Sequence, residues 1–390
     1  MYTLAKKMLL CWLLVSTVTL AYGESGWRKL TLNFYGQLLQ FNLSGDFYTQ
    51  REYLLSDISV EEKSSQLLND SDLQFFAEQA QGYANQLKLD DVGYLFMVKK
   101  VARELNKEED ANVEQLFTYA VLSLKGYDVL LGVGNTGITL YGNTDFSIKN
   151  ILFVTQNNKK YYDLSFNQFK TPGEERSVAK LNTQPTKSIR LNRLIPPSLP
   201  KKMVHKTLPF EYEGNVYFFT TTYNQHLVAY YKDLPDIELS KVYLNYGLSE
   251  RGEHTLINQL KEATSYLSKE KTVDFLLAFV QSLSYAKDID VIGHEKFSFP
   301  EESLANEFTD CEDRSMLFAY LVREVANLQS IGLMYPNASH MNVAVESWKK
   351  SNKSDIQVYE MDFVVCEPSG SGFKAGQYST NLSAANVIKW

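Results

Sequence analysis

The stretch TDCEDRSMLFAYL, Thr309–Leu321, places one of the three cysteines of this 390-residue chain at the start of a predicted helix. Asp310 is a suitable N-cap, because its carboxylate can accept hydrogen bonds from the amides of the first helical turn. Apolar residues recur at helical spacing and predict an amphipathic helix that packs inward: Leu317, Phe318, Leu321, Val322, Val325 and Leu328. Cys311 would be the first residue of this helix, where the helix dipole favours a thiolate and lowers the pKa of the thiol.

Activation of this thiol also needs a proton acceptor, because Glu312 and Asp313 oppose the dipole. His340 is the one histidine that follows the helix, and it opens HMNVAVE, residues 340–346, where apolar residues alternate as in a strand. A histidine at the start of such a strand could take the proton of Cys311. A solvent-exposed or core histidine is an equally open interpretation of this segment.

A carboxylate follows at the end of the next predicted strand, QVYEMDFVVCEPSGSG, residues 357–372. Glu367 keeps the parity of the apolar residues, and its carboxylate could fix the tautomer of the histidine, as in nucleophile–base–acid triads. Asp362 is a rival, but the same parity points it to the other face. Cys366 lies on the face opposite Glu367, which disfavours a disulfide with the helical cysteine.

Several of these segments resemble bacterial transglutaminase-like proteins, a family with a papain-like thiol fold. TDCEDRSMLFAYLVRE resembles their Asp-Cys-Glu-Asp helix, HMNVAVE their histidine strand, and VVCEPSGSG the strand that ends in the acidic residue. FVQSLSYAKD and FPEESL extend the resemblance over about residues 270–375. It implies Cys311 as nucleophile, His340 as base and Glu367 as orienting acid, although the family more often has Asp at the third position. It also implies an oxyanion hole with Gln281 as a candidate donor beside the backbone N–H of the cysteine.

The rest of the chain divides by composition and pattern. A pair of lysines, an apolar run and a small-residue cleavage site predict a secretory signal peptide over residues 1–23, with a buried helix as the alternative. The following segments are expected to be a mixed α/β domain at 24–170, a Pro-containing basic linker at 171–206, a small β module at 207–248 and the transglutaminase-like catalytic domain at 249–390. The expected fold class is therefore α+β. A basic strip that docks on an acidic surface is the alternative to the linker.

The chain also contains an internal echo. LFTYAVLSLKGYDVLLGV at 116–133 resembles LFAYLVREVANLQSIGLM at 317–334, with Leu-Phe-x-Tyr aligned in a helix that leads into a strand. The alignment places Asp110 where Cys311 stands, and the first copy lacks a downstream histidine. One interpretation is an ancient duplication whose first half is a degenerate transglutaminase-like copy. The other is a chance similarity of two amphipathic helices.

Composition limits the class of partner. The chain is 44% hydrophobic and 22% charged, and its net charge of -7 argues against nucleic acid as the main partner. No stretch after the predicted leader is apolar enough to span a membrane, so we expect export to the periplasm or cell exterior without stable membrane insertion. Neither a metal-ligand spacing nor a phosphate-binding glycine loop is present, so no metal and no cofactor are expected. The oligomeric state stays open.

The expected function is cysteine-dependent acyl transfer on amide bonds of proteins or peptides, with cell-wall peptide among the substrates. Hydrolysis is favoured over crosslinking, because no residue marks a site that holds an amine and excludes water. The main alternative is a non-catalytic exported binding or scaffold protein on the same fold. A glycan-binding surface built on the 25 tyrosines has only composition behind it.

Overall fold

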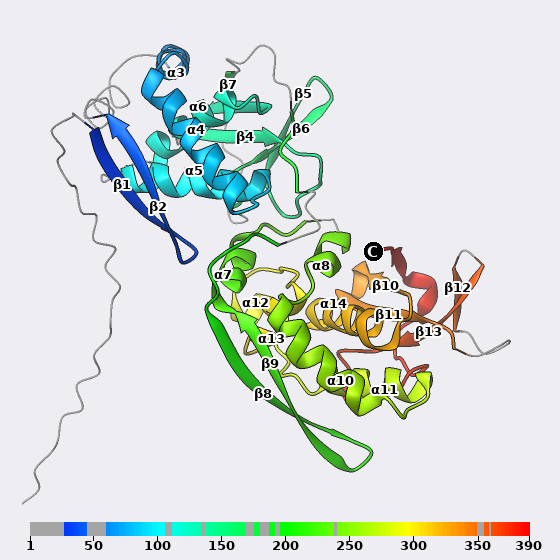
Figure 1. The fold of residues 1–390 in the computed structure, drawn as a ribbon. Helices are drawn as coiled ribbons and strands as arrows, with labels where there is room; N and C mark the ends of the chain where they lie inside the picture. Colours follow the sequence, from blue (N-terminus) through cyan, green and yellow to red (C-terminus); the bar gives the residue numbers. More distant parts are fainter. Residues whose placement is uncertain are drawn as a thin grey trace, which may run out of the picture.

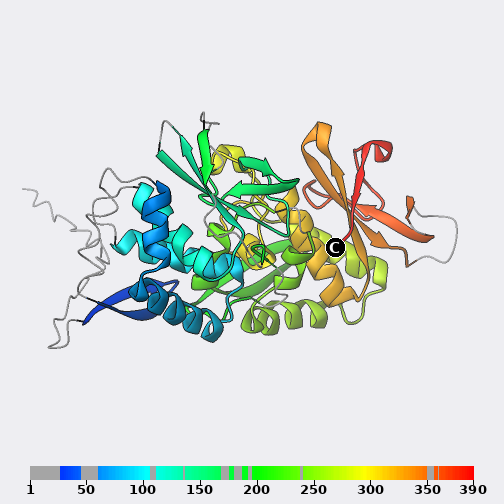
Figure 2. The same ribbon diagram turned by 90° about the horizontal axis from the view of Figure 1, so that it is seen from above.

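The computed structural model describes residues 27–44, 60–105, 111–134, 137–167, 175–179, 187–191, 196–237, 240–348, 355–358 and 360–390. The predicted signal peptide, residues 1–23, and Asp110 lie outside these ranges. The fold is α+β, as expected. It has two halves, and each runs from a β-hairpin through helices to a five-stranded antiparallel sheet (Figures 1 and 2). Among the described helices, none has the length and apolar character needed to cross a membrane.

The first half begins with a hairpin whose turn has Tyr35 and Gly36 at positive φ, 46° and 85°. The hairpin and the helices that follow it are β1 (Trp27–Phe34), β2 (Gln37–Ser44), α3 (Val60–Leu68), α4 (Ser71–Gln86), α5 (Asp91–Leu105) and α6 (Ala111–Leu124). The sheet has the order β5-β6-β4-β3-β7 and comprises β3 (Val129–Gly134), β4 (Gly137–Asn143), β5 (Phe153–Gln156), β6 (Lys159–Asp163) and β7 (Glu175–Ala179).

The second half begins with the hairpin of β8 (Met203–Tyr212) and β9 (Asn215–Asn224). Its helices are α7 (Gln225–Asp233), α8 (Ser240–Tyr246), α9 (Glu250–Gly252), α10 (Asn258–Thr264), α11 (Lys269–Gln281), α12 (Asp288–Val291), α13 (Pro300–Ala305) and α14 (Cys311–Leu321). The sheet has the order β12-β13-β11-β10-β14 and comprises β10 (Ser330–Tyr335), β11 (His340–Glu346), β12 (Ile356–Val358), β13 (Met361–Cys366) and β14 (Asn386–Ile388).

The two sheets have the same connectivity. In each half, the strand that follows the long helix (β3 or β10) pairs with the next strand (β4 or β11) and with the last strand (β7 or β14). The fourth strand (β6 or β13) lies between the second (β4 or β11) and the third (β5 or β12). The helices that lead into these sheets, α6 and α14, carry the aligned Leu-Phe-x-Tyr segments. Five antiparallel strands in one shared order favour duplication over a chance similarity of two helices.

Helix α14 is buried on every side, which differs from the amphipathic helix expected. It contacts β11 on one side and α11, α13 and α8 on others, so its polar residues also lie inside the protein (Figure 1). The helix is buried because other elements surround it at the centre of the second half, which the spacing of its apolar residues does not reveal. The helix therefore brings charged groups next to Cys311 in an environment with little water.

Two of the predicted segments differ from the observed ones. Within the predicted linker, 171–206, strand β7 pairs with β3, and Ile189 and Leu191 are buried in the core of the first half. Within the predicted β module, 207–248, the hairpin and its Glu213–Gly214 turn are present, but α7 and α8 follow. Strand β8 packs against α11, so the hairpin belongs to the second half and forms no separate module.

Candidate functional site

The start of α14 has the geometry that the sequence predicts. The Asp310 carboxylate accepts a hydrogen bond from the backbone N–H of Asp313 at 3.0 Å, so Asp310 is the N-cap. Cys311 is the first helical residue, and its backbone N–H therefore has no acceptor within the helix ladder. Ser315, one turn on, donates from Oγ to the Met341 carbonyl at 3.0 Å and ties the helix to β11.

The sulfur of Cys311 lies against the backbone on both sides of His340. Sγ is 3.7 Å from the carbonyl oxygen of Ser339, and the backbone N–H of Met341 donates to the sulfur. Burial of the helix against the sheet thus brings the cysteine next to the first residue of β11. Cys311 and His340, which the sequence predicts as nucleophile and base, are therefore neighbours in the structure.

His340 is held by a buried carboxylate. Its Nε2 lies 2.9 Å from Glu367 Oε2, and the Glu367 side chain is 3% exposed. Ser369 Oγ donates to this carboxylate at 2.7 Å. In the amide orientation that gives both ends of Asn342 a partner, its nitrogen lies 2.8 and 3.0 Å from the carboxylate oxygens and 2.8 Å from His340 Nε2, and its oxygen accepts from Thr380 Oγ1. The hydrogen bond to Glu367 is the main cause that raises the pKa of His340 above its ordinary value.

This arrangement fixes the roles that the two ring nitrogens can take. Because Nε2 of His340 faces Glu367, Nδ1 is the nitrogen left to receive the thiol proton. The extra methylene of Glu367, compared with Asp, still allows a hydrogen bond of normal length. The residue that sequence reasoning missed is Asn342. Its signal is its place two residues after the histidine on the same side of a strand.

The Cys311 thiol lies in an environment that favours its neutral form. Cys311 is 4% exposed and donates from Sγ to Glu312 Oε2 at 2.7 Å. Burial, followed by the charge and hydrogen bond of Glu312, raises the pKa of the Cys311 thiol, and the N–H of Met341 acts in the opposite direction. The expectation that the helix dipole lowers this pKa is therefore wrong for this arrangement, because burial and nearby carboxylates outweigh the dipole.

Five carboxylates gather around the start of α14. One oxygen from each of Asp288, Asp310 and Asp313 lies within 4.8 Å of the others, and Glu295 and Glu312 form a second such set with Asp310. Sets this close can share a cation or a proton. Burial raises the pKa of Asp310 and of Asp313 far above the ordinary range, and that of Asp288 to about 6, which favours a shared proton at neutral pH. Chain spacing does not reveal these sets, because their members come from separate segments.

Gln281 lies at the site but has a role other than the expected one. Its Nε2 donates to the carbonyl oxygens of Glu367 and Phe373 at 2.9 and 3.1 Å, and its Oε1 accepts from the Gly372 N–H at 3.1 Å. Both N–H groups of the amide are therefore used within the protein. Gln281 holds the loop that carries the acidic residue and has no N–H directed to an oxyanion.

Arg314 is a second residue that sequence reasoning missed. Its guanidinium is buried and donates to Thr309 Oγ1 at 3.1 Å, to the Ser369 carbonyl at 3.2 Å and to the Leu283 carbonyl, and it stacks on Tyr285 with 5.1 Å to the ring centroid. This side chain joins the nucleophile helix to the loop after β13. It is also a positive charge beside the buried carboxylates.

Replacing Glu312 by Gln should raise the rate at which iodoacetamide labels Cys311 by about tenfold or more at pH 8. The change removes the charge that repels a thiolate, and each unit by which the pKa of the thiol falls gives about tenfold more thiolate. Mass spectrometry of the native protein provides the rate, with the buried Cys366 as internal reference. Glu307→Gln, which neutralises an exposed carboxylate, is the matched control. Equal rates in wild type and Glu312→Gln would contradict the role given to this carboxylate.

Comparisons with known proteins identified no relative of this chain. No protein-family model, no curated protein and no solved structure matches the chain. The case for a chemical activity rests on the site itself and on the sequence segments that resemble the transglutaminase-like family.

Proposed function

We propose that this protein is a cysteine-dependent acyl-transfer enzyme that acts on amide bonds of proteins or peptides. The observation that carries the proposal is that Cys311, His340 and Glu367, which are far apart in the sequence, lie together in the structure. The Cys311 sulfur contacts the residues on both sides of His340, and the imidazole is 2.9 Å from the buried Glu367 carboxylate. A nucleophile, a base and an orienting acid in this order support covalent catalysis on a carbonyl carbon.

The reaction begins when the thiol leaves Glu312. Its proton passes to His340 Nδ1 and the sulfur attacks the amide carbonyl carbon, whose oxygen takes the electron pair of the C=O double bond. The backbone N–H of Cys311 stabilises this oxyanion. The protonated imidazole then gives its proton to the amide nitrogen, the C–N bond breaks, and a thioester remains on Cys311.

The thioester is resolved by water in the proposed reaction. His340 takes a proton from the water, the hydroxide oxygen attacks the thioester carbon, and the C–S bond breaks to release the acid and the thiol. Hydrolysis is the favoured outcome because the His340 side chain is 22% exposed, so that water reaches the base. With the signal peptide predicted at residues 1–23, the substrates would be proteins or cell-wall peptides outside the cytoplasm.

An activated ester tests the chemistry without knowledge of the natural substrate. Wild type mixed with p-nitrophenyl acetate should release a burst of p-nitrophenol equal to the enzyme concentration, because the acyl group is trapped on Cys311. Cys311→Ala should show no burst. Cys311→Ser is a control variant, and each variant must be shown to keep its fold. Absence of a burst in wild type would contradict the proposed acylation of Cys311.

A second assay separates the outcomes of acyl transfer. Casein is incubated with the enzyme and a labelled primary amine, and fragments as well as labelled protein are followed. Fragments without label indicate hydrolysis, whereas incorporated label indicates transfer to the amine. Both products should disappear in Cys311→Ala.

A non-catalytic binding or scaffold protein is the second candidate. The observation that favours it is the buried thiol, which donates to Glu312 and whose pKa is raised by burial and by that carboxylate. This candidate predicts that wild type and Cys311→Ala behave alike in both assays.

A further inference from the structure

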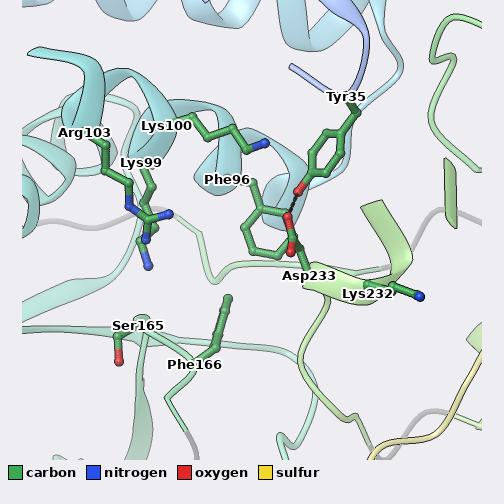
Figure 3. Close-up of a pocket in the computed structure, with 9 residues that line it drawn as sticks. All are labelled: Tyr35, Phe96, Lys99, Lys100, Arg103, Ser165, Phe166, Lys232 and Asp233. Carbon is green, nitrogen blue, oxygen red and sulfur yellow. Dashed lines mark hydrogen bonds between the residues drawn. The ribbon is translucent and has the colours of Figure 1, made fainter. Parts of the chain in front are cut away.

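A cavity of about 290 Å³ that the proposed reaction does not use lies where the first half meets the end of α7 from the second half (Figure 3). It lies between the second part of α5, the turn of the β1–β2 hairpin, the segment after β6 and the end of α7. Small-molecule sites in proteins begin at about 300 Å³, so the cavity suits one compact group.

Cations from one helix dominate this cavity. Lys99, Lys100 and Arg103 all come from α5 and line it together, while Asp233 is bonded by the Tyr35 hydroxyl (Figure 3). Glu114 adds one carboxylate from α6, 2.9 Å from Arg103 and 3.8 Å from Lys99. The cations outnumber the carboxylates in a chain whose net charge is -7. Such a local excess of positive charge attracts an anion.

Lys99 shows that the cation cluster is built into the fold. Its side chain is 8% exposed, and Nζ donates to the Leu164 carbonyl at 2.9 Å. Burial lowers the pKa of Lys99 to about 8, which reflects the cost of a charge taken out of water. An anion in the cavity would offset this cost, because it stabilises the charged form of the amine.

Aromatic rings provide the apolar part of the cavity. Phe96 and Phe166 line it and meet edge to face with 6.2 Å between ring centroids. The Lys100 ammonium lies 4.0 Å from the centroid of Tyr35. Ring faces beside cations suit a ligand whose ring has one apolar face and carries one charged group.

The cavity corresponds in the duplicated fold to the surroundings of the acidic site residue. The strand ladders end at Tyr141–Asp163 in the first half and at Val343–Cys366 in the second, so that Leu164 takes the place of Glu367. The β3–β4 ladder ends at Gly134–Gly137 and the β10–β11 ladder at Tyr335–His340, so that Gly137 takes the place of His340.

A hydrogen bond repeats at this position in both halves. Lys99 donates to the Leu164 carbonyl as Gln281 donates to the Glu367 carbonyl. The first half therefore keeps this supporting hydrogen bond but has Leu164 and Gly137 at the positions of Glu367 and His340. Ser165 and Phe166, which follow Leu164, line the cavity. The position that carries the predicted acid in the second half therefore lies beside a cavity in the first half.

We propose that this cavity binds an anionic sugar, a single ring that carries a carboxylate or a phosphate group. The anionic group faces Lys99, Lys100 and Arg103, and the ring lies against Phe96 and Phe166. Asp233, the carboxylate of the cavity, accepts a hydrogen bond from a ring hydroxyl. The inference does not depend on the reactivity of Cys311.

Calorimetric titration of the full chain tests this with four probes: glucuronate, glucose 6-phosphate, glucose and inorganic phosphate. At least one anionic sugar should bind saturably, and the tighter of the two identifies the group as carboxylate or phosphate. Glucose and inorganic phosphate should each bind at least about tenfold more weakly than this anionic sugar, because each lacks one half of the ligand. Inorganic phosphate that binds as tightly as glucose 6-phosphate would overturn the role of the ring. Absence of saturable binding by both anionic sugars would overturn the proposal.

Variants connect the binding to this cavity. Lys100→Gln and Arg103→Gln should each weaken the anionic sugar about tenfold, since each removes one charge-assisted contact. Lys261→Gln, an exposed lysine on α10, is the matched control and should bind as wild type does. Cys311→Ala should also bind normally, which separates this result from the outcome of the ester assay. Unchanged affinity in both Lys100→Gln and Arg103→Gln, with thermal unfolding confirming the fold, would assign the binding elsewhere and refute the inference.

Discussion

Replacing Glu367 by Gln should lower the rate of acylation by p-nitrophenyl acetate about 10³-fold. The neutral amide cannot stabilise the imidazolium that forms when His340 takes the thiol proton, and loss of such a carboxylate costs triad enzymes up to about 10⁴-fold. The variant should also change the pH profile. The hydrogen bond to Glu367 raises the pKa of His340, so its loss lowers that pKa. Because the neutral imidazole is the active base, the acid limb of the profile should move to lower pH.

Two variants control for a structural effect of this change. Ser369→Ala removes one donor to the same carboxylate but keeps its charge, and it should lower the rate less than about tenfold, as expected for one hydrogen bond. Glu367→Asp keeps the charge on a shorter side chain and should restore part of the rate. A Glu367→Gln protein with normal acylation and an unmoved pH profile would remove Glu367 from the site.

Replacing Arg314 by Leu should lower the free energy of unfolding by about 3–5 kcal/mol, the range for removal of one partner from a buried charged network. The guanidinium is 3% exposed and satisfies three oxygen acceptors in three different segments. Without it, the carbonyls of Ser369 and Leu283 lose a donor, and the carboxylates of Asp310 and Asp313 lose their nearby positive charge. Chemical denaturation at neutral pH measures the loss.

The exposed Arg251 on α9 offers a matched control, because Arg251→Gln removes the same charge from the surface. Surface substitutions of this kind usually change stability by less than about 0.5 kcal/mol. Arg314→Lys should lie between wild type and Arg314→Leu, since it keeps the charge but not the forked donor geometry. Equal stability of Arg314→Leu and Arg251→Gln would contradict the role given to the buried guanidinium.

Local signals predicted the parts of the site that lie close together in sequence. Asp310 as N-cap, Cys311 as the first helical residue and His340 as the first residue of a strand all agree with the structure, because capping and strand alternation act over a few residues. The Glu213–Gly214 hairpin turn is predictable for the same reason. Parity along β13 also indicated Glu367 rather than Asp362 as the partner of the histidine.

Features set by contacts between distant segments were not predictable in this way. The periodicity of α14 gives no sign that β11, α11 and α13 enclose it, so it does not predict the raised pKa of the Cys311 thiol. The contacts of Gln281 depend on a loop that follows β13, far along the chain. The prolines and charges around Ile189 predict a linker, but its apolar residues are buried in the core of the first half.

The contact between Cys311 and Glu312 has a consequence for chemical durability. Peroxides oxidise the thiolate form of cysteine and need access to the sulfur. A sulfur that is shielded from solvent and keeps its proton resists conversion to sulfenic acid. The contact with Glu312 and the burial of the sulfur should therefore slow the oxidation of Cys311 by peroxide.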